Sequence, residues 1–149
     1  MKIFLKSLCL LGLLISSHSF ASDLIMARTT APFSEAMTNL QVSLREHGYT
    51  VVRVQRIDIG LTGMGYETDK YRIVFVGKGD EIKYIINKYP QMIPYMPPKV
   101  AIFAEGRDTL LVTASPLLFA QMVDEQDRVI FERWESDVHS VFSDVRDAE

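Results

Sequence analysis

The sequence predicts an α+β fold, a two-layer sandwich in which a mainly antiparallel sheet of about five strands carries helices on one face. Segments rich in β-branched and aromatic residues, such as residues 71–76, alternate along the chain with amphipathic helical segments. Their order is strand, helix, strand, strand, helix, strand, strand, helix. Strands that are neighbours in this order can pair antiparallel, which leaves the helices to gather in one layer.

The first half of the fold begins with a strand predicted at residues 24–30. Pro32 and Glu35 then favour a helix start, because proline is tolerated in the first turn and an acidic side chain suits the positive end of the helix dipole. The apolar face of this helix is formed by Phe33, Met37, Leu40 and Leu44. Gly48 ends the helix, residues 49–57 form a second strand, and residues 58–70 are expected to be a flexible connection with three glycines.

The central unit is a strand, a short helix, a proline-rich loop and a hairpin. The strand at residues 71–76 is followed by Gly77, and a helix then starts at Asp80 and Glu81. Residues 90–98 contain four prolines, which predict a stiff and unusually apolar loop. Two further strands are predicted at residues 99–105 and 109–114.

The C-terminal part of the chain is predicted to be helical. A short helical stretch covers residues 116–123, and residues 125–146 form the longest helix of the protein. The apolar stripe of this long helix consists of Ile130, Trp134, Val138, Val141 and Val145. Two phenylalanines widen the stripe beyond a coiled-coil seam, so we expect the helix to pack on a sheet.

The first 21 residues have the pattern of a cleaved secretory signal peptide. A basic start with Lys2 and Lys6 precedes the apolar run of residues 8–15, which is too short to span a bilayer. Small residues at Ser19 and Ala21 predict cleavage after Ala21. The sequence therefore predicts a periplasmic protein without a stable membrane anchor, in which residues 22–149 form a single globular domain.

Composition excludes several classes of site in this domain. The chain's only cysteine, Cys9, lies in the predicted leader, so residues 22–149 offer no disulfide and no thiol nucleophile. Without Lys2 and Lys6 the domain carries 14 basic and 19 acidic residues, a net charge of −5. Its mildly acidic and scattered charge predicts no nucleic-acid binding. We expect no cofactor.

The apolar loop at residues 90–98 is the principal candidate for a binding surface. Prolines keep such a loop stiff, which reduces the entropy lost on binding. The loop could line a pocket or form a contact between subunits. The candidate residues for a ligand or a partner are Met64, Tyr66, Met92, Tyr95, Met96 and Pro97.

Two other kinds of site remain as alternatives. Asp58 and Glu67 could act as the acid and base of a small enzyme if they lie close together. The methionine thioethers could bind copper, although no histidine lies beside them. The glycines between Gly60 and Gly65 do not run directly into a helix, so they do not match a phosphate-binding motif.

Several short motifs resemble the Domain of Unknown Function 302 family, and their order covers residues 24–145. These motifs are Gly48-Tyr49, Ile57-Asp58, Gly63, Val74-Phe75-Val76-Gly77, Met96-Pro97, Val100-Ala101-Ile102-Phe103, Glu105-Gly106 and Pro116. The resemblance implies a compact α+β domain, often dimeric, whose molecular function is largely unassigned. Family members often carry asparagine and proline after the glycine of the third strand, whereas this chain has Lys78-Gly79.

These observations together predict an exported, non-enzymatic domain that binds a small ligand or a protein partner, with a homodimer as one possibility. The carboxylate enzyme and the copper site are the alternatives to this interpretation.

Overall fold

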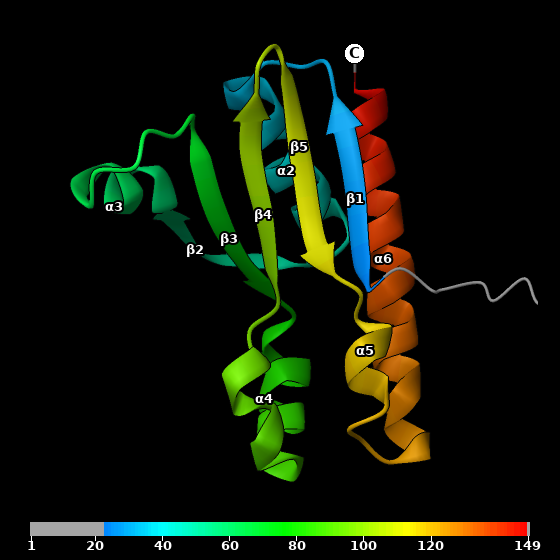
Figure 1. The fold of residues 1–149 in the computed structure, drawn as a ribbon. Helices are drawn as coiled ribbons and strands as arrows, with labels where there is room; N and C mark the ends of the chain where they lie inside the picture. Colours follow the sequence, from blue (N-terminus) through cyan, green and yellow to red (C-terminus); the bar gives the residue numbers. More distant parts are fainter. Residues whose placement is uncertain (1–22, 149) are drawn as a thin grey trace, which may run out of the picture.

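The computed structural model of this chain describes residues 23–148, so the predicted leader at residues 1–21 lies outside the described residues. Residues 23–148 form a five-stranded sheet in the order β1-β5-β4-β3-β2, and every neighbouring pair is antiparallel (Figure 1). The strands are β1 (Leu24–Thr29), β2 (Thr50–Arg56), β3 (Tyr71–Gly77), β4 (Lys99–Glu105) and β5 (Asp108–Ala114). The predicted α+β class is confirmed.

Two long helices, α2 (Phe33–Glu46) and α6 (Arg128–Asp147), pack on one face of this sheet and contact each other (Figure 1). Four short elements lie beyond the lower end of the strands: α4 (Gly79–Lys88), η1 (Pro90–Tyr95), α5 (Leu117–Ala120) and η2 (Glu125–Asp127). None of the helices within residues 23–148 is long and apolar enough to cross a membrane.

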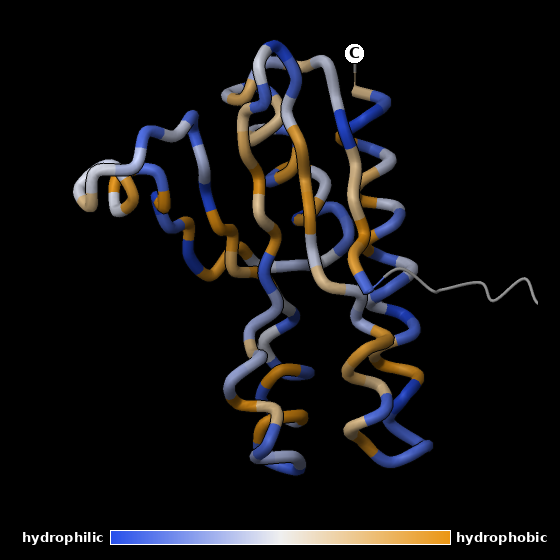
Figure 2. The backbone as a smooth tube through the Cα atoms, viewed as in Figure 1, coloured by the Kyte–Doolittle hydropathy of each residue, from blue (hydrophilic) through white to orange (hydrophobic). Residues whose placement is uncertain are grey.

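The apolar stripes predicted for the two long helices face the core. In α2, Leu40 and Leu44 are buried, and in α6 the buried residues include Trp134 and Val141. Figure 2 shows the same alternation along α6, where hydrophobic and hydrophilic segments follow one another. Burying these stripes against the sheet supplies the main driving force for the fold.

The connection after β2 differs from the prediction. It contains a short helix, α3 (Ile57–Gly63), where the sequence predicted a flexible loop. The Asp58 carboxylate accepts a hydrogen bond from the Ile59 N–H and forms an ion pair with Arg72 of β3 at 2.5 Å. These contacts at the first turn hold a helix that its glycines would disfavour. In Figure 1 this helix stands apart from α4 and α5 at the β2 side of the sheet.

The segments below the sheet are joined by one buried carboxylate. Asp127 of η2 accepts hydrogen bonds from Lys88 Nζ at 2.7 Å and from Tyr89 Oη at 2.5 Å. It also accepts a hydrogen bond from Tyr84 Oη at 3.2 Å. The bonds from Lys88 and then Tyr89 lower the pKa of Asp127, so the carboxylate stays charged at neutral pH. This network connects α4 to the start of α6.

Gly77 at the end of β3 is required by close packing rather than by an unusual backbone angle. A Cβ at this position would overlap Cδ1 of Ile82 in α4 and would meet Pro97 Cβ at 4.0 Å. Rotation about χ2 of Ile82 would move Cδ1, but Cγ1 would still lie 3.1 Å from the added Cβ, and χ1 of an isoleucine in a helix is restricted to one main rotamer. Gly77 therefore fixes how closely α4 approaches the end of the sheet.

We expect the substitution Gly77→Ala to lower the free energy of unfolding by about 1–3 kcal/mol, because it forces Ile82 out of its packed position. Chemical denaturation followed by circular dichroism measures this change. Gly79→Ala is the matched control, because a Cβ on Gly79 meets nothing within 4 Å and alanine favours the helix. Equal stabilities for the two variants would show that Ile82 does not constrain residue 77.

Candidate ligand-binding pocket

An apolar cavity of about 100 Å³ lies between the sheet and α6, at the end of the sheet where β4 begins and β5 ends. Its strand-derived and loop-derived lining consists of Tyr49, Val76, Tyr95, Pro98, Lys99, Val100, Thr113, Ala114 and Pro116. Its helix-derived lining consists of Leu44, Phe119, Trp134, Val138, Val141 and Phe142. The cavity wall thus combines side chains from α2, β3, η1, β4, β5, α5 and α6.

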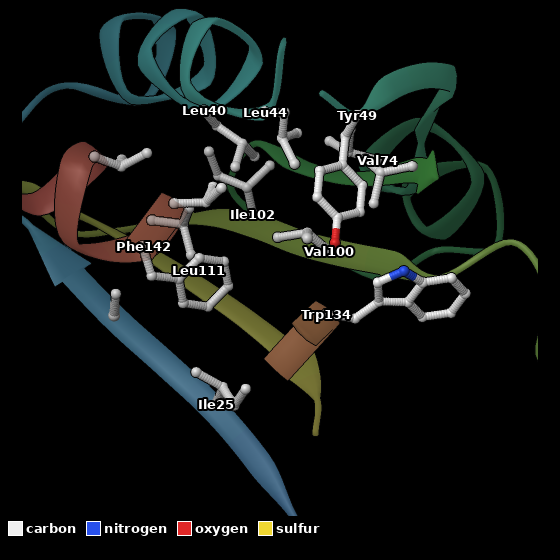
Figure 3. Close-up of a cluster of buried hydrophobic side chains, with 14 of the residues drawn as sticks. Ile25, Leu40, Leu44, Tyr49, Val74, Val100, Ile102, Leu111, Trp134 and Phe142 are labelled. Atoms are coloured by element: carbon white, nitrogen blue, oxygen red, sulfur yellow. The ribbon is translucent and has the colours of Figure 1, made fainter. Parts of the chain in front are cut away.

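The regular spacing of residues along α6 and along the strands brings these side chains to the cavity. Trp134, Val138 and Val141 follow one another at spacings of four and three residues, so they line one face of α6. Val100 pairs with Val74 in the neighbouring strand and points to the same face of the sheet. Figure 3 shows Tyr49, Val100 and Trp134 together at one end of the buried cluster.

A polar network surrounds the cavity without leaving a free group inside it. Tyr49 Oη and Lys78 Nζ both donate hydrogen bonds to Asp137, each at 2.9 Å. The Lys78 ammonium group also lies 4.6 Å from the centroid of the Tyr49 ring, within cation–π distance. Burial, reinforced by the Asp137 hydrogen bond, raises the pKa of Tyr49 far above its usual range. Tyr49 therefore remains a neutral hydrogen-bond donor that is engaged by Asp137.

The side chains of Trp134 and Thr113 beside the cavity also have hydrogen-bond partners. Trp134 Nε1 donates to Glu81 at 2.6 Å, and Thr113 Oγ1 donates to the Lys99 carbonyl at 2.8 Å. Across residues 23–148, every buried side-chain nitrogen or oxygen makes a hydrogen bond. A ligand in the cavity would gain affinity mainly from apolar contact and shape, because none of the buried side-chain nitrogens and oxygens of residues 23–148 lacks a hydrogen bond.

Two aromatic rings stand at the outer side of the cavity. The rings of Tyr95 from η1 and Phe119 from α5 lie 5.3 Å apart between centroids, at an interplanar angle of 41°. Tyr95 is 46% exposed, so it lines the cavity and also reaches solvent. The pair is a contact between η1, which follows α4, and α5, which precedes α6.

The proline-rich loop predicted as a binding surface contributes Tyr95 and Pro98 to the cavity wall. Met96 and Pro97 do not line the cavity: Met96 is partly buried against the core, and Pro97 packs near Gly77. Met92, from the same loop, is fully buried and belongs to the hydrophobic core. Its thioether therefore packs against apolar neighbours.

The structure separates the other two predicted residues from this group. Met64 and Tyr66 follow α3 and are 68% and 62% exposed. Neither residue lines the cavity, and Figure 1 shows α3 apart from α4 and the segment that follows it. Met64 is likewise separated from the methionines of the proline-rich loop, which gives a shared copper site no support.

The two carboxylates considered as an acid and a base have different surroundings. Asp58 is held by Arg72, whose hydrogen bond keeps the pKa of Asp58 below its usual range, while Glu67 is exposed in the connection after α3. A carboxylate paired in this way is a poor proton donor at neutral pH. Within residues 23–148 there is also no cluster of three or more histidine, cysteine or acidic side chains that could hold a metal ion.

The sequence analysis did not identify Phe119, Trp134 and Val138 as cavity residues. Trp134 and Val138 were placed correctly on the apolar stripe of the long helix. No sequence pattern distinguishes a stripe residue that packs tightly from one that borders an empty volume. Phe119 lies in a segment of only four helical residues, where no periodicity can be read.

Comparison with known proteins identifies the fold. A crystal structure of an uncharacterised conserved DUF302 protein from Bacillus stearothermophilus is similar to this chain, with a TM-score of 0.75 and 19% sequence identity. The similarity covers 85% of this chain and 100% of that one. No curated protein sequence matches the chain. The family model for the domain of unknown function DUF302 matches residues 25–144, and the chain therefore belongs to the DUF302 family.

Proposed function

We propose that this protein is a non-enzymatic binding protein that accepts a small apolar group in the cavity between the sheet and α6. The observation that carries the proposal is an apolar cavity beside which the buried polar side-chain atoms are all hydrogen-bonded within the protein. Concave, largely apolar and preformed sites are typical of small-molecule binding in proteins.

The size of the cavity limits what it can hold. An engineered apolar cavity of about 150 Å³ is sufficient to bind benzene, and typical drug-sized sites measure roughly 300–1,000 Å³. A volume of about 100 Å³ fits a short alkyl chain or part of a ring. We infer that the cavity takes the apolar end of a ligand, and that the rest of the molecule lies against Tyr95 and Phe119.

The candidate residues predicted from the sequence fall into two groups, those near the cavity and those far from it. Tyr95 belongs to the proposed binding region together with Phe119, Trp134 and Val138, which also line the cavity. Met96 and Pro97 follow Tyr95 in the same loop and do not line the cavity. Met92 supports this region from within the core. Met64 and Tyr66 would serve a different contact, such as one with a protein partner.

We further propose that the protein is exported to the periplasm. The basic start, the short apolar run and the small residues before Ser22 support this location.

Export predicts that the secreted protein begins at Ser22. Intact-mass measurement of the protein purified from the periplasm tests this expectation, with a cytoplasmic fraction from the same cells as the control. A chain that retains residues 1–21 and remains in the cytoplasm would contradict it.

The single tryptophan gives the binding proposal a direct assay. Trp134 lines the cavity, so a probe with a short alkyl chain such as 1-butanol should change its fluorescence in a saturable way. We expect a Kd on the order of 0.1–1 mM for a ligand with so few atoms. Val138→Phe should fill the cavity and abolish the response, with a stability cost of about 1–3 kcal/mol.

Val129→Phe is the matched control for this experiment. Val129 lies on the same helix and is exposed, and it does not line the cavity. This variant should bind 1-butanol as the unmodified protein does. If Val138→Phe lowers the melting temperature too far, Val138→Leu adds a smaller volume to the same place. An unchanged response in both Val138 variants, or a linear and unsaturable response in the unmodified protein, would contradict the proposal.

A further inference from the structure

The polar side chains that line the cavity fall into a paired and an unpaired group. Tyr49, Thr113 and Trp134 each donate a hydrogen bond within the protein. Tyr95 and Lys99 are the remaining polar lining residues, and neither Tyr95 Oη nor Lys99 Nζ forms a hydrogen bond or an ion pair with a residue of the described range 23–148. A ligand group that requires a hydrogen bond at this cavity therefore meets these two side chains.

Both unpaired side chains belong to the outer side of the cavity. Tyr95 ends η1 and Lys99 begins β4, so only residues 96–98 separate them in the chain. Tyr95 is half-exposed, and Lys99 is also exposed. Lys99 pairs with Phe75 of β3, and strand alternation turns its side chain away from α6, so its ammonium group has to pass around the end of β4 to reach the rim. A lysine stem commonly lies along apolar surface while its ammonium group stays in water.

The acidic side chains that accept hydrogen bonds from the cavity wall have basic partners of their own. Asp137 forms an ion pair with Lys78 at 2.9 Å, and Glu81 forms one with Arg133. Lys99 is the basic residue of the lining and has no such partner within residues 23–148. The cavity is thus bordered by compensated carboxylates on its inner side and by one uncompensated positive charge at its rim.

The two groups at the rim complement an anionic ligand. A lysine ammonium group donates hydrogen bonds and accepts none, and a tyrosine hydroxyl donates one. Both can donate to the oxygens of one carboxylate, and hydrogen bonds that involve ionised groups are about twice as strong as neutral ones. An alcohol lacks the negative charge, and an alkyl ammonium group would be repelled by Lys99.

We propose that the ligand of this cavity is a short alkyl monocarboxylate. Its chain fills the apolar volume, and its carboxylate lies at the rim, where the Lys99 ammonium group and the Tyr95 hydroxyl donate hydrogen bonds to it. This inference rests on the proposed function, because it names the class of ligand for the same site.

Three probes that share a butyl group test the inference. Pentanoate, 1-butanol and butylamine place a negative, a neutral and a positive group at the end of the same chain at pH 7. Isothermal titration at constant ionic strength should give a Kd for pentanoate that is about five- to tenfold lower than that for 1-butanol. Butylamine should bind more weakly than 1-butanol. Added salt should reduce the preference for pentanoate, because Lys99 is exposed to solvent.

The ratio of the Kd for 1-butanol to the Kd for pentanoate is the readout for the variants. Lys99→Met removes the ammonium group and keeps a stem of similar length, so the ratio should fall to about one. Tyr95→Phe keeps the ring against Phe119 and removes only the hydroxyl, so it should lower the ratio by a smaller factor. Lys83→Met is the matched control, since Lys83 is an exposed lysine of α4 that does not line the cavity. It should keep the ratio of the unmodified protein.

The possible results separate this inference from the proposed function. Binding of 1-butanol without a preference for pentanoate would overturn the carboxylate and leave the apolar site in place. A preference that persists in Lys99→Met, or one that is lost equally in Lys83→Met, would also overturn the role of Lys99. Failure of all three probes to bind would overturn the proposed function and this inference together. Circular dichroism should give the same spectrum for every variant.

Discussion

The length of α6 is the constraint on which the rest of the structure depends. Twenty residues make a helix of roughly 30 Å, whereas strands of six or seven residues extend for about 20–23 Å. The apolar stripe of α6 continues past the end of the sheet, so other parts of the chain must cover it there. The segments α4, η1 and α5 lie in this position, and Asp127 joins α4 to the start of α6 through Lys88 and Tyr89. The cavity lies where η1 and α5 meet the end of the sheet. Neither the sheet nor the two long helices fill this volume completely.

The two faces of the sheet have different surroundings. One face forms the core with α2 and α6, and its buried Thr109 and Thr113 donate hydrogen bonds to backbone carbonyls. The other face also carries apolar side chains, of which Leu24 and Met26 at the β1 edge are exposed. The proposed cavity site lies on the face that the helices cover.

Much of the fold could be predicted from the sequence because it depends on local periodicity. The stripe of Trp134, Val138 and Val141 identified α6 and its buried face, and the strand at residues 71–76 was recognised from its β-branched residues. The helix α3 was missed because it depends on a contact between Asp58 and Arg72, which lie 14 positions apart in the sequence. For the candidate site, the sequence pointed to the proline-rich loop, from which Tyr95 lines the cavity whereas Met96 and Pro97 do not. The contact of Tyr95 with Phe119 and the separation of Met64 could not be recognised, because both depend on how distant segments pack.

Diffraction from crystals pressurised with xenon tests the central claim most directly. Xenon enters apolar cavities that are accessible and free of water, so it reports whether the volume beside Trp134 can accept an apolar group. We predict a strong xenon peak bounded by Trp134, Val138 and Phe119, and its loss in crystals of Val138→Phe. A cavity that holds ordered water bonded to protein groups, or one that excludes xenon, would contradict the account.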